Sequence, residues 1–251
     1  MMAEHEANAG VRSKVGTFRK ILERTRPVLR NWFLETFTDA RDWVAKRIAF
    51  SQSLAANSML GYAVGLGDRH LQNILLDVTT AEVIHIDLNL IFDQAKRLRI
   101  PEQVPFRLTR DFIDAMGVCG VEGVFRNSCE ATLAVLCNYR EIFLTILEVF
   151  RHDPLCRWSV SKLTIENMRR KGIDFAGAGS DVSGKQQSDL GAIESGFSEA
   201  DRVILKVKEK LSGGVGGAST LSIRGQVNHL IQMASREEHL ACIFPGWEPW
   251  Y

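Results

Sequence analysis

The sequence predicts a mainly α-helical domain that carries one small antiparallel β-hairpin. The first observation is a long stretch of helical periodicity that begins after Thr38 or Asp39, either of which is a favourable N-cap. The second is a pair of short apolar runs, "NILLD" and "EVIHID", which are separated by "VTTA" and have the length of two hairpin strands. The third is a succession of further helical segments after residue 108. Together these patterns indicate a helical domain built around one hairpin.

The first half of the chain is expected to lead into a surface loop. Residues 11–30 mix apolar and basic side chains, and Pro27 is expected to kink or end a helix there. The long helix that follows should stop near Gly65 or Gly67, because glycine readily adopts the left-handed backbone that closes a helix. Residues 88–107 show no clear period and contain two prolines, so we expect one long loop, a feature that is usually functional or disordered.

The second half of the chain is expected to be helical, with one interruption. "TRDFIDAMG" has Thr109 as a candidate N-cap and Gly117 as a stop. "VEGVFRNSCEATLAVLC" and the strongly apolar "REIFLTILEVFRH" predict two more helices, of which we expect the second to be buried. Residues 171–196 are rich in Gly, Ser and Asp, which predicts a disordered linker.

The C-terminal part is expected to hold two short units. Residues 197–218 predict a helix, "ADRVILKVKEKL", followed by a glycine-rich break. Residues 219–251 predict a short helix and a capping box of Ser235 with Glu238. The chain then ends in an aromatic cluster of Phe244, Trp247, Trp250 and Tyr251. These aromatic side chains form either an exposed docking surface or, as we favour, a patch that packs back on the domain and braces the loop at 88–107.

Composition limits the class of protein. The formal net charge of +1 gives no case for nucleic-acid binding by bulk charge. Five cysteines without a CxxC pair indicate reduced thiols inside the cell rather than a disulfide framework. Residues 1–10 are polar, so we expect them to be disordered and to carry no signal peptide. No apolar run is long enough to span a bilayer, which predicts a soluble intracellular chain.

The stretch "LGDRHLQNILL" carries the chemistry that the sequence predicts. Asp68 and Asn73 are five residues apart, the spacing of the Asp and Asn in the protein-kinase catalytic loop, usually written H-R-D-x-x-x-x-N. Phosphoryl transfer needs an acid beside the substrate hydroxyl and oxygen ligands for magnesium. Asp68 suits the first role, and the hairpin should fold Asp87 back beside Asn73 to form one metal site. His70 has the pKa range to shuttle a proton or to stabilise phosphate charge.

Less specific interpretations exist for each of these residues. An isolated Asp-Arg-His is more often a solvated turn or an ion pair, and an Asn that starts a strand is ordinary. The combination of a glycine-bounded loop, the Asp-to-Asn spacing, an apolar hairpin and a second Asp at its end favours a kinase-type site. His85, which lies next to the end of the second strand, is more readily interpreted as a packing residue.

Longer motifs resemble one family. "GYAVGLGDRHLQNILLD", "AEVIHIDL", "VPFRLTRDFIDAMGVCGVEGVFR" and "HDPLCRW" resemble the phosphatidylinositol 3-kinase-related protein kinases, closest to their ATM subfamily and with some features of the ATR subfamily. "GQVNHLIQ" and "FPGWEPWY" resemble the FATC segment that closes these kinases. The resemblance covers about residues 20–160 and 200–251, and its reversed order, G-D-R-H-x-x-N, is the form of the catalytic loop in this superfamily.

The resemblance implies roles for individual residues. It implies that Asp68 is the catalytic Asp, that His70 assists at the transferring phosphate and that Arg69 braces the loop. It implies that Asn73 and Asp87 are the ligands of Mg²⁺, with Mn²⁺ as the alternative metal, beside the cofactor ATP.

The resemblance also assigns segments. Leu75 and Ile86 resemble the residues that form the floor beneath the adenine of ATP. The catalytic loop corresponds to residues 66–73 and the activation segment to residues 87–107. The family usually has Gly two positions after the metal Asp, where this chain has Asn89; because Asn tolerates positive φ, we expect the turn to form.

The implied fold is the C-lobe of a kinase of this type, mainly α with a small β-hairpin, over residues 11–170, followed by a FATC domain over residues 219–251. Nothing before Val11 resembles an N-lobe, so we expect the N-lobe to be absent and these 251 residues to be inactive by themselves.

The resemblance also implies partners and a location. The implied partners are protein substrates with Ser/Thr-Gln sites, DNA-damage sensor complexes bound through upstream regions, and proteins that contact the FATC domain. The implied location is the nucleus, and we expect no direct nucleic-acid binding and no membrane span. The alternatives are a non-catalytic interaction fragment and, less favoured, a phosphoinositide kinase fragment.

Overall fold

A computed structural model describes residues 2–151, 199–214 and 220–251 of the chain. The helices are α1 (Met2–Arg24), α2 (Leu29–Thr36), α3 (Ala40–Val64), α4 (Arg110–Ala115), α5 (Val124–Asn138), α6 (Arg140–Arg151), α8 (Glu199–Leu211), α9 (Ile223–Ala234) and α10 (Glu237–Leu240). The 3-10 turns are η1 (Leu71–Asn73), η2 (Gln94–Arg97) and η3 (Pro245–Trp247), and the strands are β1 (Ile74–Leu76) and β2 (Val83–His85). The linker expected at 171–196 and the "HDPLCRW" motif lie outside the described residues.

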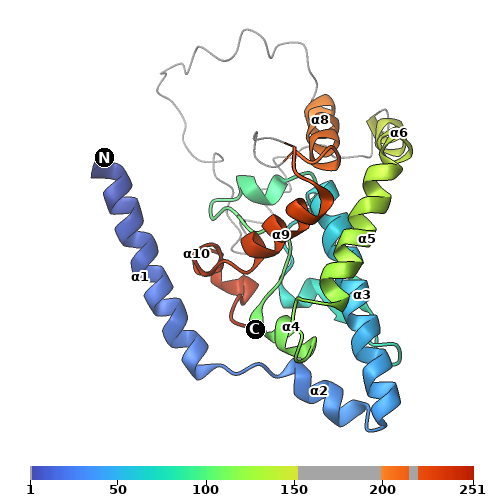
Figure 1. Ribbon diagram of the computed structural model, residues 1–251. Helices are drawn as coiled ribbons and strands as arrows, with labels where there is room; N and C mark the ends of the chain where they lie inside the picture. Colours follow the sequence, from blue (N-terminus) through green and yellow to red (C-terminus); the bar gives the residue numbers. More distant parts are fainter. Residues whose placement is uncertain (1, 152–198, 215–219) are drawn as a thin grey trace.

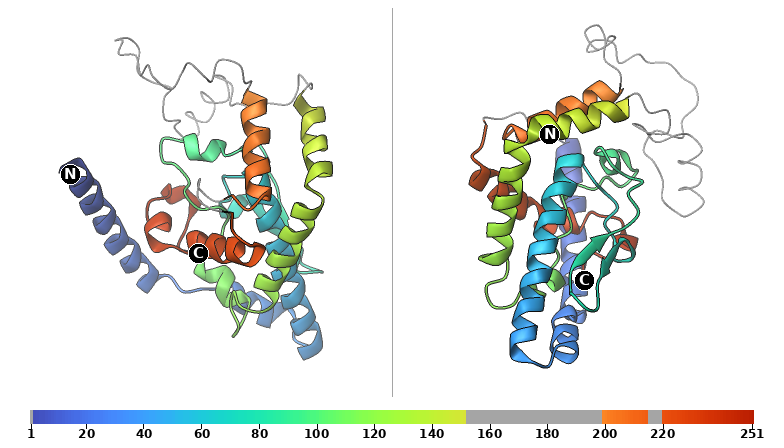
Figure 2. Two further views of the ribbon diagram at one scale, coloured as in Figure 1. Left: turned by 45° about the horizontal axis from the view of Figure 1, so that its top comes forward. Right: turned by 90° about the vertical axis from the view of Figure 1, so that its right-hand side faces the viewer.

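Helices α3 and α5 form the centre of the molecule, where they run side by side (Figures 1 and 2). Of the two candidate caps for α3, the structure uses Asp39, whose carboxylate accepts hydrogen bonds from the backbone N–H of Arg41 and Asp42, both at 3.0 Å. The helix ends at Val64 because Gly65 takes a left-handed backbone with φ 65°. Both ends of the long helix are therefore where the local sequence predicts them.

The hairpin is held on the side of α3. Its strands pair antiparallel, with Leu75 opposite Ile84. The backbone N–H of Val83 donates to the Ser53 hydroxyl at 2.9 Å, and the Asn57 side-chain amide donates to the Val83 carbonyl at 2.9 Å. An isolated two-stranded hairpin is marginally stable in water. The helix therefore fixes a strand pair that is too short to be stable by itself.

The main core lies between α2, α3, α4, α5 and α9. Phe50 stands at its centre, with edge-to-face contacts to Phe33 and Phe112 at centroid distances of 5.3 and 6.0 Å. Asp111 of α4 caps α2 across this core, because its Oδ1 accepts from the backbone N–H of Val28 at 2.7 Å and of Leu29 at 2.9 Å. The start of α2 therefore depends on a carboxylate more than eighty residues away in the chain.

A second cluster joins α6 to α8, which lie side by side at one end of α5 (Figure 2). Leu144 and Leu147 of α6 are buried against Val207 and Leu211 of α8. The prediction that α6 is buried is half right, because Ile142 on its other face is 61% exposed. A strongly apolar helix segment is consistent with either environment, and the sequence pattern does not separate them.

Three local expectations differ from the structure. Residues 1–10 were expected to be disordered, but α1 begins at Met2, where Ala and Glu give the segment high helix propensity. Ser235 forms no capping box with Glu238; it closes α9 and its hydroxyl donates to the Ile231 carbonyl at 2.9 Å. Thr109 takes the N-cap position of α4, yet its hydroxyl makes no capping hydrogen bond.

Within the described parts of the chain, no helix combines the length and apolarity that a membrane crossing requires.

The core predicts a clear contrast between two positions of α5. Leu133 is fully buried between α3 and α9, so Leu133→Ala should lower the free energy of unfolding by about 3 kcal/mol through lost burial and the cavity left behind. Val135, two residues further along the chain, is 55% exposed. Val135→Ala should therefore change the free energy of unfolding by less than about 0.5 kcal/mol. Urea unfolding followed by circular dichroism measures both; equal losses would show that α5 is packed differently.

Candidate functional site

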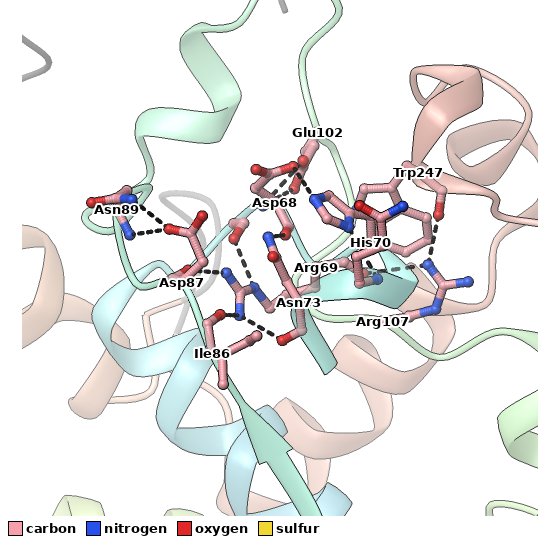
Figure 3. Close-up of polar contacts among 12 residues, drawn as sticks. Asp68, Arg69, His70, Asn73, Ile86, Asp87, Asn89, Glu102, Arg107 and Trp247 are labelled. Atoms are coloured by element: carbon pink, nitrogen blue, oxygen red, sulfur yellow. Dashed lines mark hydrogen bonds and ion pairs between the residues drawn. The ribbon is translucent and has the colours of Figure 1, made fainter. Parts of the chain in front are cut away.

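The loop that follows α3 has an unusual backbone. Asp68 takes a left-handed conformation with φ 58°, which is uncommon for a residue with a side chain. The side-chain amide of Asn73 donates to the Asp68 carbonyl at 2.8 Å and so closes the loop on itself. Turn η1 then leads directly into β1. The spacing of five residues between Asp68 and Asn73 is therefore the span of one closed turn (Figure 3).

Arg69 joins this loop to the end of the hairpin. Its side chain is 2% exposed, and the guanidinium donates to the carbonyls of Gly67 at 2.8 Å, Asn73 at 3.4 Å and Ile86 at 2.7 Å, and to that of Asp87. Burial lowers the pKa of Arg69, although the nearby carboxylates of Asp68 and Asp87 oppose the shift. The five N–H donors of a guanidinium suit this task, which the ammonium of a lysine would not perform.

Asp87 lies at the other side of this arginine. The N–H of Ile86 donates to the Asn73 carbonyl at 3.0 Å, so the segments that carry Asn73 and Asp87 are directly bonded. Asp87 has φ 54°, and its Oδ1 accepts from the backbone N–H of Asn89 at 3.2 Å and from the Asn89 side-chain amide at 2.5 Å. The turn expected at Asn89 thus forms, but the left-handed residue in it is Asp87.

Two histidines near the loop have different environments. His70 Nε2 lies 4.0 Å from Asp68 Oδ1, and its Nδ1 accepts from the Gln72 N–H at 3.2 Å. Burial raises the pKa of Asp68, which makes this carboxylate more basic than an exposed one. His85 is the last residue of β2, where burial and, to a smaller degree, the Arg69 charge lower its pKa to about 4. His85 is therefore a neutral packing residue, as the sequence suggested.

Two buried residues beside the loop were missed by sequence reasoning. Both carboxylate oxygens of Glu102 accept from the Asp68 N–H, at 3.1 and 3.0 Å. Arg107 is 2% exposed and donates to the Arg69 carbonyl at 3.3 Å. Both lie in "PEQVPFRLT", a stretch whose charged residues among prolines and apolar residues are the one local signal of burial. Their partners are 34 and 38 residues away in the chain and have no local signature.

Arg107 also binds the C-terminal segment. Its guanidinium donates to the main-chain oxygens of Trp247 at 2.7 Å, Glu248 at 2.8 Å and Tyr251 at 2.8 Å, and lies 4.3 Å from the centroid of the Trp247 ring. Trp247 is 2% exposed and packs against Val104 of the loop at 88–107. The C-terminal aromatic segment therefore packs back on the domain beside the loop at 66–73, with Phe244 as its exposed member.

A cleft of about 1240 Å³ lies at the start of the loop, beside Gly65, Leu66 and Gly67. The residues that line it come from the loop entry, from η2 and from helices α8 to α10. The lining includes Gly65 and Gly67, and also Lys210 and Asp93, which form a half-buried ion pair at 2.9 Å. The site thus consists of an acid-bearing loop closed by hydrogen bonds, the oxygen-bearing side chains of Asn73 and Asp87 on two joined segments, and an adjacent cleft.

Comparison with known families and proteins identifies relatives of this arrangement. Residues 2–160 match the family described as phosphatidylinositol 3- and 4-kinase, and residues 220–251 match the FATC domain. The chain is 46% identical over 247 residues to serine/threonine-protein kinase ATM of Arabidopsis thaliana and 42% identical over 247 residues to serine-protein kinase ATM of Sus scrofa. These matches cover 98% and 97% of this chain but 6% and 8% of the relatives, so the chain spans a small part of their length.

The solved structures agree with the sequence relatives. The FAT and kinase domain of CtTel1 superposes with a TM-score of 0.80 at 38% identity, over 96% of this chain and 15% of that one. The resemblance inferred from the motifs, and the fold that it implied, are thereby confirmed.

The environment of His85 predicts a pH dependence of stability. Unfolded His85 binds a proton with a pKa near 6.5, whereas the folded protein resists this proton until about pH 4. The free energy of unfolding should therefore fall by up to about 3 kcal/mol as the pH is lowered through this window. His85→Gln should remove that part of the slope in urea unfolding measured at half-unit pH steps. An identical slope in the variant would show that His85 titrates normally.

The contacts of Arg107 predict that the C-terminal segment depends on a guanidinium. In Arg107→Lys a compact ammonium group replaces the planar guanidinium. The free energy of unfolding should then fall by about 3 kcal/mol, because several main-chain oxygens lose their hydrogen-bond donors. Iodide should also quench the fluorescence of Trp247 more strongly. Arg140→Lys, at an exposed pair with Glu141, is the matched control and should change neither quantity. Retained shielding of Trp247 in Arg107→Lys would contradict this account.

Proposed function

Because the chain belongs to the phosphatidylinositol 3- and 4-kinase family, we propose that it forms the catalytic C-lobe and FATC segment of an ATM-like serine/threonine protein kinase. The observation that carries the proposal is the closed turn from Asp68 to Asn73, tied by Arg69 to the carbonyl of Asp87. Phosphoryl transfer asks a protein chiefly for fixed positions and for charge stabilisation, and this turn supplies both.

Asp68 acts on the substrate hydroxyl in this proposal. Its carboxylate accepts the hydroxyl proton, a role that its raised pKa supports. His70 stands within 4.0 Å of that carboxylate, where its ring supports the charge that develops on the transferring phosphate. The hydrogen bonds described above from the Arg69 guanidinium all go to backbone carbonyls, so Arg69 acts as a brace for the loop.

Asn73 and Asp87 suit a hard divalent cation. Asn73 uses its amide nitrogen on the Asp68 carbonyl, which leaves its side-chain oxygen available. Asp87 Oδ1 accepts the two hydrogen bonds from Asn89, and among the described residues no side chain forms a hydrogen bond with Asp87 Oδ2. Mg²⁺ is commonly held by one or two such oxygens together with substrate phosphates, and Mn²⁺ accepts the same donors. When bound, ATP would supply the γ-phosphate, and the metal would neutralise part of its negative charge.

Leu75 and Ile86 fit a floor for the adenine. They lie on the two paired segments of the hairpin, and they are 47% and 39% exposed although apolar. Exposed apolar side chains beside a polar site are the usual lining of a ligand pocket. We propose that these two side chains contact the base of ATP.

The substrates proposed are proteins with Ser/Thr-Gln sites, acting in DNA-damage signalling in the nucleus. The names of the relatives, serine/threonine-protein kinase and serine-protein kinase, support a protein substrate. DNA-damage sensor complexes are proposed to bind through upstream regions of a longer chain, and the C-terminal segment to contact proteins. Residues 11–170 are proposed as the C-lobe and residues 219–251 as the FATC domain.

The experiment replaces the matching region of Arabidopsis ATM by these 251 residues and measures transfer of labelled phosphate. The chimera should phosphorylate a Ser-Gln peptide with ATP and Mg²⁺, and Asp68→Asn should lower kcat at least a hundredfold, roughly the contribution of a general base. Asp42→Asn, at a half-exposed carboxylate at the start of α3, is the matched control. The chain without the ATM portion should transfer little phosphate.

Other outcomes would change the proposal in defined ways. Equal activity of Asp68→Asn and the parent chimera would remove Asp68 from catalysis. Transfer to phosphatidylinositol vesicles in place of the peptide would make the chain part of a lipid kinase. A folded chimera that transfers phosphate to neither substrate would favour a non-catalytic interaction segment.

A further inference from the structure

Glu102 is a buried carboxylate at the far end of the activation segment. It is 8% exposed, and its side chain points at the catalytic loop from the segment between η2 and α4 (Figure 3). Oε1 and Oε2 lie 3.1 and 3.0 Å from the backbone nitrogen of Asp68, which donates to both. The contact joins residues that are 34 positions apart in the chain.

This arrangement is unfavourable for a residue that serves folding alone. Burying a carboxylate is costly unless charged or hydrogen-bonding partners compensate. Among the described residues no cation forms a salt bridge with Glu102, and Arg69 acts on it only at a distance. Burial raises the pKa of Glu102 to about 7, and the neighbouring Asp68 carboxylate adds to the shift. Its hydrogen-bonding partner is the amide of Asp68.

Asp68 needs an external constraint on its backbone. A left-handed conformation is unfavourable for a residue with a side chain and persists where the surroundings enforce it. The preceding Gly67 approaches the activation segment so closely that a Cβ there would lie 2.2 Å from the Ala95 Cβ. The Glu102 N–H in turn donates to the Ala95 carbonyl at 3.2 Å. Glu102 is therefore fixed to the part of the segment that touches the loop.

The contact continues a row of bonds between the two segments. The N–H of Phe92 donates to the Val64 carbonyl at 2.8 Å, that of Asp93 to Gly65 at 2.9 Å, and that of Gly67 to Leu90 at 2.8 Å. The bond from Asp68 to Glu102 is next in this row and reaches the proposed catalytic residue itself. The position of the activation segment therefore acts directly on the backbone of Asp68, through the hydrogen bond from its N–H to Glu102.

We propose that Glu102 is a positioning residue, whose carboxylate holds the Asp68 amide so that the catalytic side chain is aimed only while the activation segment is seated on the loop. The proposal rests on the proposed catalytic role of Asp68. It assigns the coupling between segment and loop to one side chain, with no contact between Glu102 and the substrate. Displacing the segment frees the Asp68 amide, and the left-handed conformation then loses its restraint.

The first test measures the contact without using catalysis. In the 251-residue chain, the amide hydrogen of Asp68 should exchange at least about tenfold faster in Glu102→Ala, because its acceptor is lost. Glu102→Gln keeps one acceptor oxygen and should exchange within about threefold of the parent. Glu141→Gln makes the same chemical change on an exposed helix position and should leave the rate unchanged. Unchanged exchange in Glu102→Ala would overturn the proposal.

The second test measures positioning in the chimera with Arabidopsis ATM. Glu102→Ala should lower kcat at least about tenfold and leave KM for ATP unchanged, since the residue acts through Asp68. Glu102→Gln should restore most of kcat, whereas Glu102→Asp should not, because its carboxylate ends one methylene short. Comparison of these two conservative variants decides the question if the alanine variant does not fold.

The outcomes separate this inference from the proposed function. A chimera that is active and whose kcat is unchanged by Glu102→Ala overturns the role of Glu102 alone. Equal kcat values for Glu102→Gln and Glu102→Asp do the same, since reach would then not matter. A folded chimera that is inactive before any substitution overturns the proposed function, and with it the role assigned here, whatever the exchange rates show.

Discussion

The buried guanidinium of Arg69 is the interaction on which the rest of the site depends. It gathers the carbonyls of the loop and of the hairpin end onto one planar group, and thereby fixes Asp68, Asn73 and Asp87 relative to one another. Carbonyl groups repel one another when they converge, so a cation with several donors is the natural centre for such a turn. A buried cation without these partners would cost several kcal/mol, so the arginine and the fold of the loop require each other.

A second buried arginine extends this arrangement to the end of the chain. Arg107 donates to the Arg69 carbonyl on one side and to carbonyls of the C-terminal segment on the other. Arg110 adds bonds from the same stretch to Trp250 and to Leu22 at the end of α1. Segments from both ends of the described chain therefore meet behind the loop. This connection gives the C-terminal aromatic residues a structural part in the site, which an exposed docking surface would not have.

Strain and support are distributed unevenly across this region. Asp68 and Asp87 both have left-handed backbones, each at a cost of about 1 kcal/mol or more. Each is also held by neighbours: Asp68 by Glu102 and Asn73, and Asp87 by Arg69 and Asn89. The main core, with the packed rings of Phe33, Phe50 and Phe112, contributes the folding free energy that offsets the cost of these two strained residues. A rigid α3 with the hairpin fixed along it transmits that stability to the loop.

The amino-acid sequence by itself determined the local features. The Asp39 cap, the end of the long helix at Gly65, the two strands and the spacing of Asp68 and Asn73 depend on neighbouring residues, and each could be predicted from them. The positions of Glu102 and Arg107, the exposed face of α6 and the unused capping box at Ser235 could not. Their partners lie up to 144 residues away, and burial depends on which segments the core brings together. Tertiary structure alone decided these contacts, because only the packed chain determines which polar groups are removed from water and must find partners.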